Sequence, residues 1–205
     1  MKAQLSLQAQ PGAWRMYSAR KANAAFGAFQ KKILHRDRYT CQFCGFQARQ
    51  YQDLVNLDGN YRNNKARNIV TACCFCTQCF FLESVGVGDF GGGTLIYLPE
   101  ISQEQLNSFC HVIFCAITND TGYKASAQSI YRSFKFRSQL VEDALGEGSS
   151  SPSTVGQLLI DSAKTDIKEQ QKLLDGVRLL PSRAKFRQQI ERWAATALDE
   201  LSSDE

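Results

Sequence analysis

Histidine is scarce in this sequence, and long apolar runs are absent from it. Only His35 and His111 are available for histidine-based chemistry among the 205 residues. No window approaches the roughly 18 consecutive apolar residues of a membrane-spanning helix, and the N-terminal stretch MKAQLSLQAQPGAWR lacks the apolar core of a secretory signal. The sequence therefore predicts a cytoplasmic protein without a transmembrane span.

The composition that is present is typical of a globular protein. Hydrophobic residues make up 43% of the chain and charged residues 21%, which excludes intrinsic disorder as the default. A chain of 205 residues is long enough for one large domain, or for one ordinary domain with an appendage. We therefore expect a folded protein.

The net charge of +4 hides an uneven distribution along the chain. Residues 1–72 carry 12 Lys and Arg against 3 Asp and Glu, whereas residues 73–205 carry 12 against 17. A basic face of this kind attracts phosphates or an acidic protein surface. The alternative is a solvated surface that only keeps the protein in solution, since no basic run is as dense as a nucleic-acid-binding tract.

Local patterns in the first hundred residues predict both helices and strands. Residues 15–36 place apolar side chains at close to helical spacing and predict one amphipathic helix. Alternation over residues 39–43 predicts a strand that enters a tight turn, and residues 68–72 predict a second strand. The stretch GVGDFGGG at 86–93 is followed by a strand-like run, TLIYLP, where a dinucleotide fingerprint needs a helix, so we interpret it as a flexible loop.

A helix with one buried face is predicted to follow. Ser102 and Gln105 have the form of a capping box, and apolar residues recur every three or four positions as far as Ile117. Cys110 and His111 lie within this pattern, and we interpret them as packing residues of the helix.

The clearest composition break lies near residue 150. GEGSSSPST, at 146–154, predicts a linker or long surface loop between a domain of residues 1–145 and a helical C-terminal extension of residues 155–205. Within the extension, residues 155–175 and 183–201 predict two helices. We expect their apolar stripes to pack on each other and on the core, with a free docking groove as the alternative.

The strongest chemical signal is the arrangement of the cysteines. A C-x-x-C pair is followed, 29 residues later, by a dense second cluster, and two such turns brought together form the tetrahedral thiolate site that zinc prefers. An iron–sulfur cluster is the rival, but its usual spacing is not matched. The second pair is either Cys73 with Cys76 or Cys76 with Cys79. Because residues 68–72 lead directly into Cys73, we predict one structural Zn²⁺ bound by Cys41, Cys44, Cys73 and Cys76.

The cysteine pairs flank a stretch that resembles an HNH-endonuclease ββα-metal frame. The resemblance covers roughly residues 36–79 and rests on YTCQFCG, LVNLDGNYRNN and ARNIVTACCFC. It implies an α+β fold in which a zinc-stabilised ββα core is surrounded by helices. In that family a histidine heads the hairpin as general base, and here the position is Asn56, while Thr77 stands at a closing position that binds metal. An amide cannot take up the proton near neutral pH, so we predict no catalytic residue and no enzyme activity.

The cysteine cluster together with TLIYLPEISQEQLN resembles the IcmJ/DotN family of the Dot/Icm type IVB secretion system, over most of the chain. The resemblance implies a cytoplasmic adaptor of the coupling complex, peripheral to the inner membrane. It also implies the partners: the C-terminal extension of the coupling ATPase DotL, with DotM and the subunits IcmS, IcmW and LvgA beside it. The assembly recruits effector substrates for export.

The basic N-terminal region, residues 1–72, suggests where such a partner would bind. We predict a contact surface that combines cationic and aromatic side chains, namely Arg36, Arg38, Arg62, Lys65 and Arg67 with Tyr39, Phe43, Tyr51 and Tyr61. The alternative function is an HNH-type nuclease or a DNA- or RNA-binding module that keeps the older frame, with phosphate contacts from the same cations.

Overall fold

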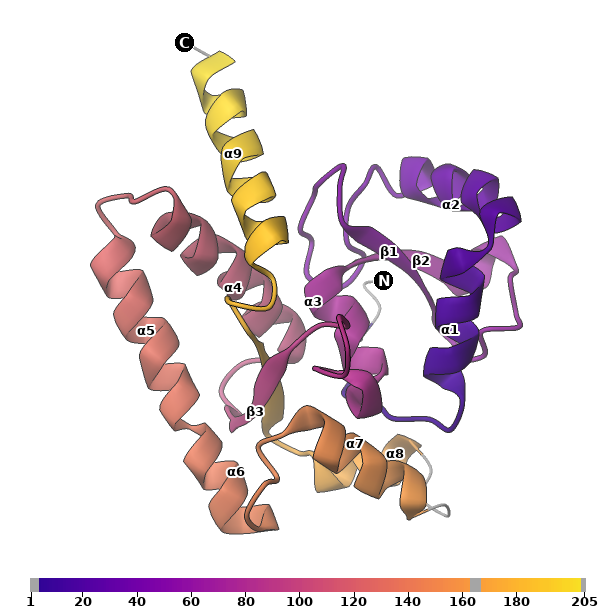
Figure 1. Ribbon diagram of the computed structural model, residues 1–205, viewed down its shortest axis with the longest axis vertical. Coiled ribbons are helices and arrows are strands. Elements are labelled where there is room, and N and C mark those ends of the chain that lie inside the picture. The colour runs from indigo at the N-terminus through magenta and orange to yellow at the C-terminus, as the bar shows by residue number, and fades with distance from the viewer. Residues whose placement is uncertain (1–3, 163–166, 204–205) are drawn as a thin grey trace.

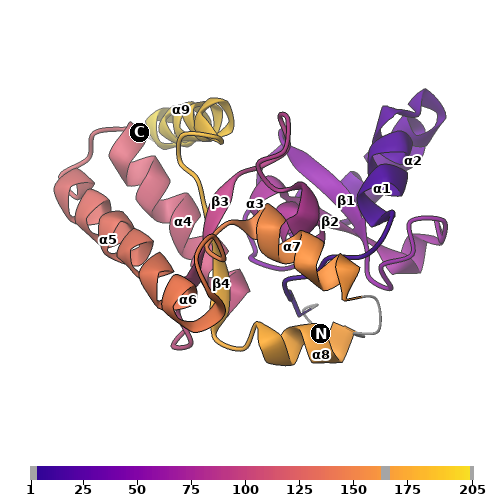
Figure 2. The same ribbon diagram turned by 60° about the horizontal axis from the view of Figure 1, so that its bottom comes forward.

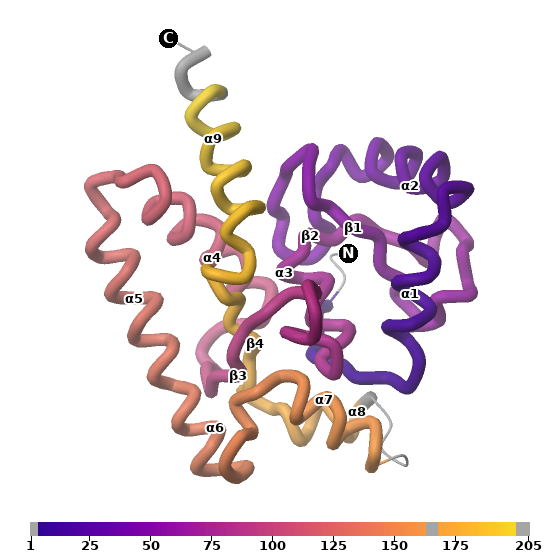
Figure 3. Tube along the Cα trace, viewed as in Figure 1, coloured from indigo at the N-terminus to yellow at the C-terminus, as the bar shows by residue number. Residues whose placement is uncertain are grey.

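The computed structural model describes residues 4–162 and 167–203 and has a mixed α and β architecture (Figure 1). The N-terminal helices and the first hairpin lie on one side of the molecule, and the helices of residues 103–145 lie on the other (Figure 3). The helices are α1 (Ala13–Ala22), α2 (Ala24–Arg36), α3 (Cys74–Thr77), α4 (Gln103–Thr118), α5 (Lys124–Phe136), α6 (Ser138–Leu145), α7 (Pro152–Asp161), α8 (Ile167–Leu173) and α9 (Arg187–Ser203). The strands are β1 (Gln52–Asn56), β2 (Ile69–Cys73), β3 (Gly93–Tyr97) and β4 (Val177–Pro181), and short 3₁₀ turns cover Ala66–Asn68, Gln78–Phe80 and Leu82–Ser84.

The strands form two small antiparallel sheets. In the first, β1 pairs with β2, with Gln52 opposite Cys73 and Asn56 opposite Ile69. In the second, β3 pairs with β4, a strand that lies far along the chain, and Figure 2 shows the two side by side. The C-terminal region thus contributes a strand to a sheet that begins before residue 100.

The predicted helix over residues 15–36 is wrong in one respect, because the structure has two helices there. The chain breaks at Asn23, which is extended, with φ −80° and ψ 112°, and whose side chain accepts a hydrogen bond from the backbone N–H of Ala25. Asparagine is among the preferred N-cap residues, because its oxygen satisfies a free N–H of the first turn. The cap therefore starts a new helix within a continuous apolar pattern.

The predicted strand over residues 39–43 is also wrong. Arg38 and Tyr39 have φ values of 53° and 54°, in the left-handed region, and the only bridge nearby joins Thr40 to Gln47. Both residues therefore turn the chain sharply after α2 and lead it into the first cysteine pair.

Other expected elements are confirmed. The second strand is β2, the run after the glycine-rich loop is β3, and the capping box of Ser102 and Gln105 begins α4 with both reciprocal hydrogen bonds formed. The last predicted helix corresponds to α9. The patterns did not reveal β1, α5, α6 or β4.

The segment 146–154 packs against its neighbours. The backbone carbonyl of Ser150 accepts a hydrogen bond from Leu95 of β3, and the Glu142 carboxylate accepts from the backbone N–H groups of Gly148 and Ser150. Ser151 then caps α7. The helix predicted over 155–175 corresponds to α7 and α8, and residues 163–166 lie outside the described residues. The division into two domains at 146–154 stays a prediction.

The core is continuous with the cysteine cluster. Its fully buried large side chains include Phe75, Phe81, Leu95 and Leu106, and they pack in one cluster with the cysteines. Within residues 4–162 and 167–203, no helix combines the length and the apolar composition needed to cross a membrane.

A close approach between α7 and the turn at Leu82–Ser84 leaves the acidic side chain of Glu83 half-buried. A Cβ atom at Gly156 would lie 2.2 Å from the backbone nitrogen of Glu83, so only glycine fits at this point of α7. Burial raises the pKa of Glu83 to about 7, and its Oε2 atom has no hydrogen-bond partner in the described structure.

Replacing Glu83 by Gln is expected to stabilise the protein at pH 8. The folded-state pKa is above the unfolded value, so the folded state binds more protons and stability falls as pH rises from about 4.5 to about 7. Allowing for the partial exposure of the side chain, the gain is on the order of 1 kcal/mol. Urea unfolding at pH 5 and pH 8 measures it, with the exposed Glu147→Gln as control; an equal effect at both pH values would contradict the prediction.

Candidate metal centre

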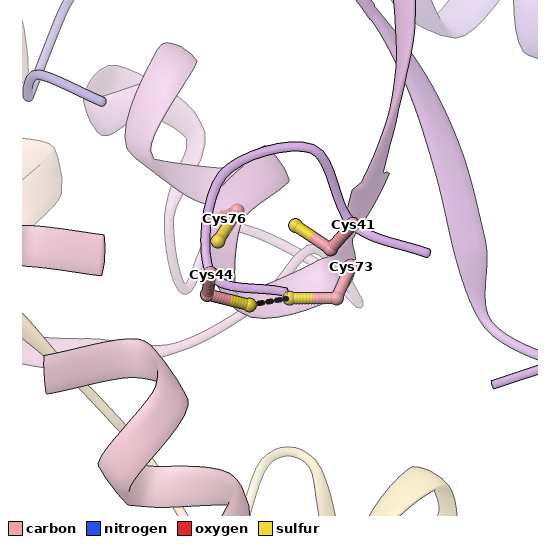
Figure 4. A group of neighbouring side chains, drawn as sticks. All are labelled: Cys41, Cys44, Cys73 and Cys76. Carbon is pink, nitrogen blue, oxygen red and sulfur yellow. Dashed lines mark hydrogen bonds between the residues drawn. The ribbon is translucent and has the colours of Figure 1, made fainter. Parts of the chain in front are cut away.

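Four cysteines from two separate segments meet in the interior. Cys41 and Cys44 lie in the turn after α2, Cys73 ends β2 and Cys76 lies in α3. Their Sγ atoms all lie within 4.8 Å of one another, and those of Cys44 and Cys73 are 3.6 Å apart (Figure 4). All four residues are buried. The structure thus brings together the four sulfurs that the spacing selected.

Backbone hydrogen bonds hold the first pair in place. Cys41 donates its N–H to the carbonyl of Phe46, and Gly45 donates to the carbonyl of Cys41 with a φ of 81° that favours glycine. Gln42 donates to the carbonyl of Thr71 in β2. The turn is therefore closed on itself and attached to the strand that supplies Cys73.

The geometry of the group fits a tetrahedral zinc ion. With Zn–S distances of roughly 2.3 Å, the sulfurs of a regular tetrahedron lie about 3.8 Å apart. The Cys44–Cys73 separation of 3.6 Å is close to that value, and the group contains only cysteines. Four thiolates complete the tetrahedron and leave no position for water or substrate, so a zinc ion here would be structural.

The protonation of the cluster depends on a cation. Burial raises the pKa of Cys73 and of Cys76, because a thiolate loses its hydration in the interior. Burial also opposes the ionisation of Cys41, but hydrogen bonds from Cys44, Cys73 and Cys76 outweigh it and lower its pKa. A divalent ion would stabilise all four thiolates together.

Two side chains of α4 approach the sulfurs from outside the group. The Nδ2 atom of Asn107 lies 3.2 Å from the Sγ atom of Cys76, and the Nε2 atom of His111 lies 3.4 Å from that of Cys73. Residues four apart lie on one face of a helix, so one edge of α4 faces the centre. Such N–H groups stabilise thiolate charge by hydrogen bonding.

The orientation of the Asn107 amide follows from its other partner. Its Oδ1 atom accepts a hydrogen bond from Gln103 Nε2 at 2.9 Å, which leaves Nδ2 directed at the sulfur. Gln103 in turn bonds both the N–H and the carbonyl of Leu179 in β4. This buried series of amides connects the metal centre to the second sheet.

His111 is enclosed by aromatic rings. It stacks on Phe46, with ring centroids 3.6 Å apart, and on Phe75, at 4.3 Å. Burial lowers the pKa of His111 to about 3, so the ring is neutral at physiological pH. It lies outside the group of four sulfurs and packs against the centre, as the helical pattern had indicated. The polar residues 103, 107 and 111, spaced by four in an apolar helix, were the unused signal in the sequence for this layer.

The two remaining cysteines of the cluster lie apart from the centre. Cys79 donates its thiol to the carbonyl of Phe75 at 3.4 Å, and burial raises its pKa and that of Cys74. The alternative pairing of Cys76 with Cys79 is therefore not the one that the structure assembles.

Substituting the spare cysteines separates them from the predicted ligands. Cys74→Ala and Cys79→Ala are each expected to retain one zinc per chain, whereas Cys76→Ala should lose it, because three thiolates hold zinc far more weakly than four. Elemental analysis of the purified variants measures this. Zinc loss in Cys79→Ala together with retention in Cys73→Ala would support the alternative pairing instead.

The position of the expected catalytic histidine has a structural role. Asn56 is fully buried, donates to the carbonyls of Asn60 and Asn63 at 2.8 and 2.9 Å, and accepts a hydrogen bond from the Arg20 guanidinium. Thr77 is also fully buried, and His35 is exposed in the last turn of α2. Asn56 therefore holds the loop of the hairpin together.

Two aromatic residues of the predicted contact surface are buried and cannot contact a partner. Tyr61 is only 4% exposed and packs on Tyr17 and Phe81, so it belongs to the core. Phe43 is likewise buried. Arg36 is exposed in part but bonds Asp37 and two backbone carbonyls, whereas exposed side chains are present at Arg38, Arg62, Lys65 and Arg67 and partly exposed ones at Tyr39 and Tyr51.

Comparison with known proteins identifies the family. No protein-family model matches the chain. The chain is 66% identical over 201 residues to the type 4 apparatus protein DotN of Legionella pneumophila, a match that covers 98% of this chain and 94% of DotN. The chain belongs to the DotN family. The resemblance that rested on the cysteine cluster and on TLIYLPEISQEQLN is thereby confirmed.

Proposed function

We propose that the protein is a non-catalytic, zinc-binding adaptor subunit of a type IVB secretion coupling complex. Its membership of the DotN family is the observation that carries this proposal. The all-cysteine centre adds to it, because a site without an open ligand position supports a rigid scaffold better than a reaction. In this role the protein lies in the cytoplasm beside the inner membrane.

In the proposed state one Zn²⁺ is held by Cys41, Cys44, Cys73 and Cys76. The ion cross-links the turn after α2 to the end of β2 and the start of α3. The protein's own residues then do the rest: Asn107 and His111 donate toward the sulfurs, and the aromatic rings exclude water. The turn after α2, the hairpin and α3 are thereby held in one conformation.

The hairpin β1–β2 with α3 is, in this proposal, a degenerate HNH-like core. A hairpin followed directly by a helix is the arrangement such a core requires, and β2 runs into α3 without a break. The hairpin residue available for general-base work is Asn56, whose amide is fully occupied by Arg20, Asn60 and Asn63. The frame then serves to present surface and not to cleave phosphodiesters.

The proposed partner is the C-terminal extension of the coupling ATPase DotL, in a complex that also contains DotM, IcmS, IcmW and LvgA. Co-expression with a tagged DotL C-terminal segment and size-exclusion chromatography test it, and we expect one complex that contains both chains. A folded, zinc-loaded protein that elutes apart from the segment would contradict the adaptor role. In parallel, incubation with plasmid and Mg²⁺ or Mn²⁺ should leave the DNA intact, and cleavage lost on Asn56 substitution would reinstate the nuclease alternative.

A further inference from the structure

A basic cavity lies between the first cysteine turn and α9. Its volume is about 520 Å³, and three arginines line it, Arg38 and Arg49 from the turn and Arg192 from the helix. Tyr39, Trp193 and Phe46 supply the aromatic part of the lining. No Asp or Glu is among the described residues that line it, so the cavity carries three positive charges and no internal counter-charge.

The donors of the three guanidinium groups are largely unused. Arg38, Arg49 and Arg192 are exposed, and none forms a salt bridge within residues 4–162 and 167–203. Arg49 lies over the ring of Tyr39 at 5.7 Å, and among the residues that the structure describes Arg192 donates a hydrogen bond only from its Nε–H, to Gln50. The remaining N–H groups are free for an anionic ligand, and guanidinium forks match carboxylates in bidentate geometry.

The cavity is built on a fixed and strained piece of backbone. Arg38 and Tyr39 are consecutive non-glycine residues with positive φ, an unfavourable conformation that is concentrated at functional sites. The carbonyl of Arg38 accepts from Gln47, and Trp193 donates its Nε1–H to the carbonyl of Gln50. The turn and α9 therefore hold the rim in position before any ligand arrives.

An apolar cavity adjoins the basic one. It measures about 570 Å³, shares Phe46 and Gln47 with the basic cavity, and is otherwise lined in part by His111, Val112 and Tyr123. Val112 is 64% exposed and Tyr123 is 77% exposed, so two large apolar side chains border it unburied. A ligand that crosses the turn at Phe46 would thus meet three cations on one side and an apolar surface on the other.

We propose that these adjoining cavities bind an acidic segment of a partner protein, with its carboxylates against Arg38, Arg49 and Arg192 and a large apolar side chain beside Val112 and Tyr123. Nucleic acid is less well matched, because its phosphates need cations distributed along a track and it has no use for the apolar cavity. The middle of α9 forms one wall of the basic cavity, and the C-terminal end of the helix extends beyond the other elements (Figure 1). The inference rests on the proposed adaptor function and specifies the chemistry of its partner.

Fluorescence anisotropy with the full-length protein tests the inference. The probe is a short labelled peptide rich in Glu that contains Leu and Phe, and it is compared with the same peptide with Gln in place of Glu and with a single-stranded oligonucleotide. The pair Arg49→Glu with Arg192→Glu is expected to weaken peptide binding at least about tenfold, because like charges then face each other. Arg38→Glu with Arg49→Glu should do the same without touching the contact of Arg192 with Gln50.

The matched control is Lys168→Glu with Lys172→Glu in α8, which changes the net charge equally on the opposite side of the molecule (Figure 2). It should bind the peptide like the wild type, and all variants should keep their zinc. Equal losses in pocket and control variants, equal binding of the Gln peptide, or preference for the oligonucleotide would each overturn the inference. Association with the DotL segment is measured separately, so a wild-type protein that binds this segment but not the acidic peptide overturns this inference alone.

Discussion

Replacing Cys41 by Ser, or removing zinc with a chelator, is expected to unfold the N-terminal part of the protein around the cysteine cluster. A structural zinc in a cysteine site contributes roughly 10 kcal/mol or more at neutral pH, which is as large as the whole stability of an ordinary domain. The effect is large here because the turn of Cys41 and Cys44 is joined to the rest by few backbone hydrogen bonds, to Thr71 and within itself. Without the metal, the buried thiols of the four-cysteine group would also remain in the core with no ion to bind.

The experiment compares far-UV circular dichroism and urea unfolding of the wild type, Cys41→Ser and the chelator-treated protein. Cys115→Ser is the matched control, because Cys115 is partly exposed and lies outside the group of four. We expect the control to unfold at the same urea concentration as the wild type. Cys41→Ser should lose its cooperative unfolding transition, or unfold at a much lower urea concentration. A Cys41→Ser protein as stable as the control would show that the sulfurs merely pack together.

Replacing Asn56 by Ala is expected to cost about 2–3 kcal/mol of stability. The substitution removes one acceptor of Arg20, a side chain that is 9% exposed, and one of the two donors to each of the carbonyls of Asn60 and Asn63. Arg20 keeps the carbonyl of Leu54 at 2.7 Å, a longer contact with Asn64 Oδ1 at 3.4 Å, and the rings of Phe26 and Tyr61. None of these replaces the hydrogen bond to Asn56.

Asn60→Ala is the control for this substitution, because Asn60 lies in the same loop and is exposed. Its side-chain oxygen accepts a hydrogen bond from the backbone N–H of Arg62. The cost of Asn60→Ala should stay below roughly 1 kcal/mol. Asn56→His should also be destabilised and should leave plasmid DNA intact, since the ring cannot make all three contacts. A stable Asn56→His protein that cleaves DNA would mean that the hairpin is a nuclease frame after all.

The positions of the cysteines could be predicted because metal-ligand spacing is local. Two residues between sulfurs determine that a turn can present both to one ion, and the strand before Cys73 determined the partner pair. The capping box of Ser102 is local in the same sense, since it is complete within four residues. In both cases the signal and the structure occupy the same short stretch.

The features that the sequence did not reveal depend on distant contacts. Val177–Pro181 becomes a strand only because Gly93–Tyr97 is there to pair with it, and its own pattern contains no alternation and ends in proline. Tyr61 lies in a polar, asparagine-rich stretch and is buried only because Tyr17 and Phe81 reach it from elsewhere. Arg192 lies more than 140 residues along the chain from Arg38 and Arg49, so only the fold reveals that the three arginines meet around the basic cavity.

Native mass spectrometry of the purified, fully folded protein tests the central claim most directly. The account predicts that the purified protein contains one zinc ion per chain without added zinc. Replacing any one of Cys41, Cys44, Cys73 and Cys76 should abolish this binding. A protein that is folded and cooperative in the same preparation but has the mass of the metal-free chain would contradict it.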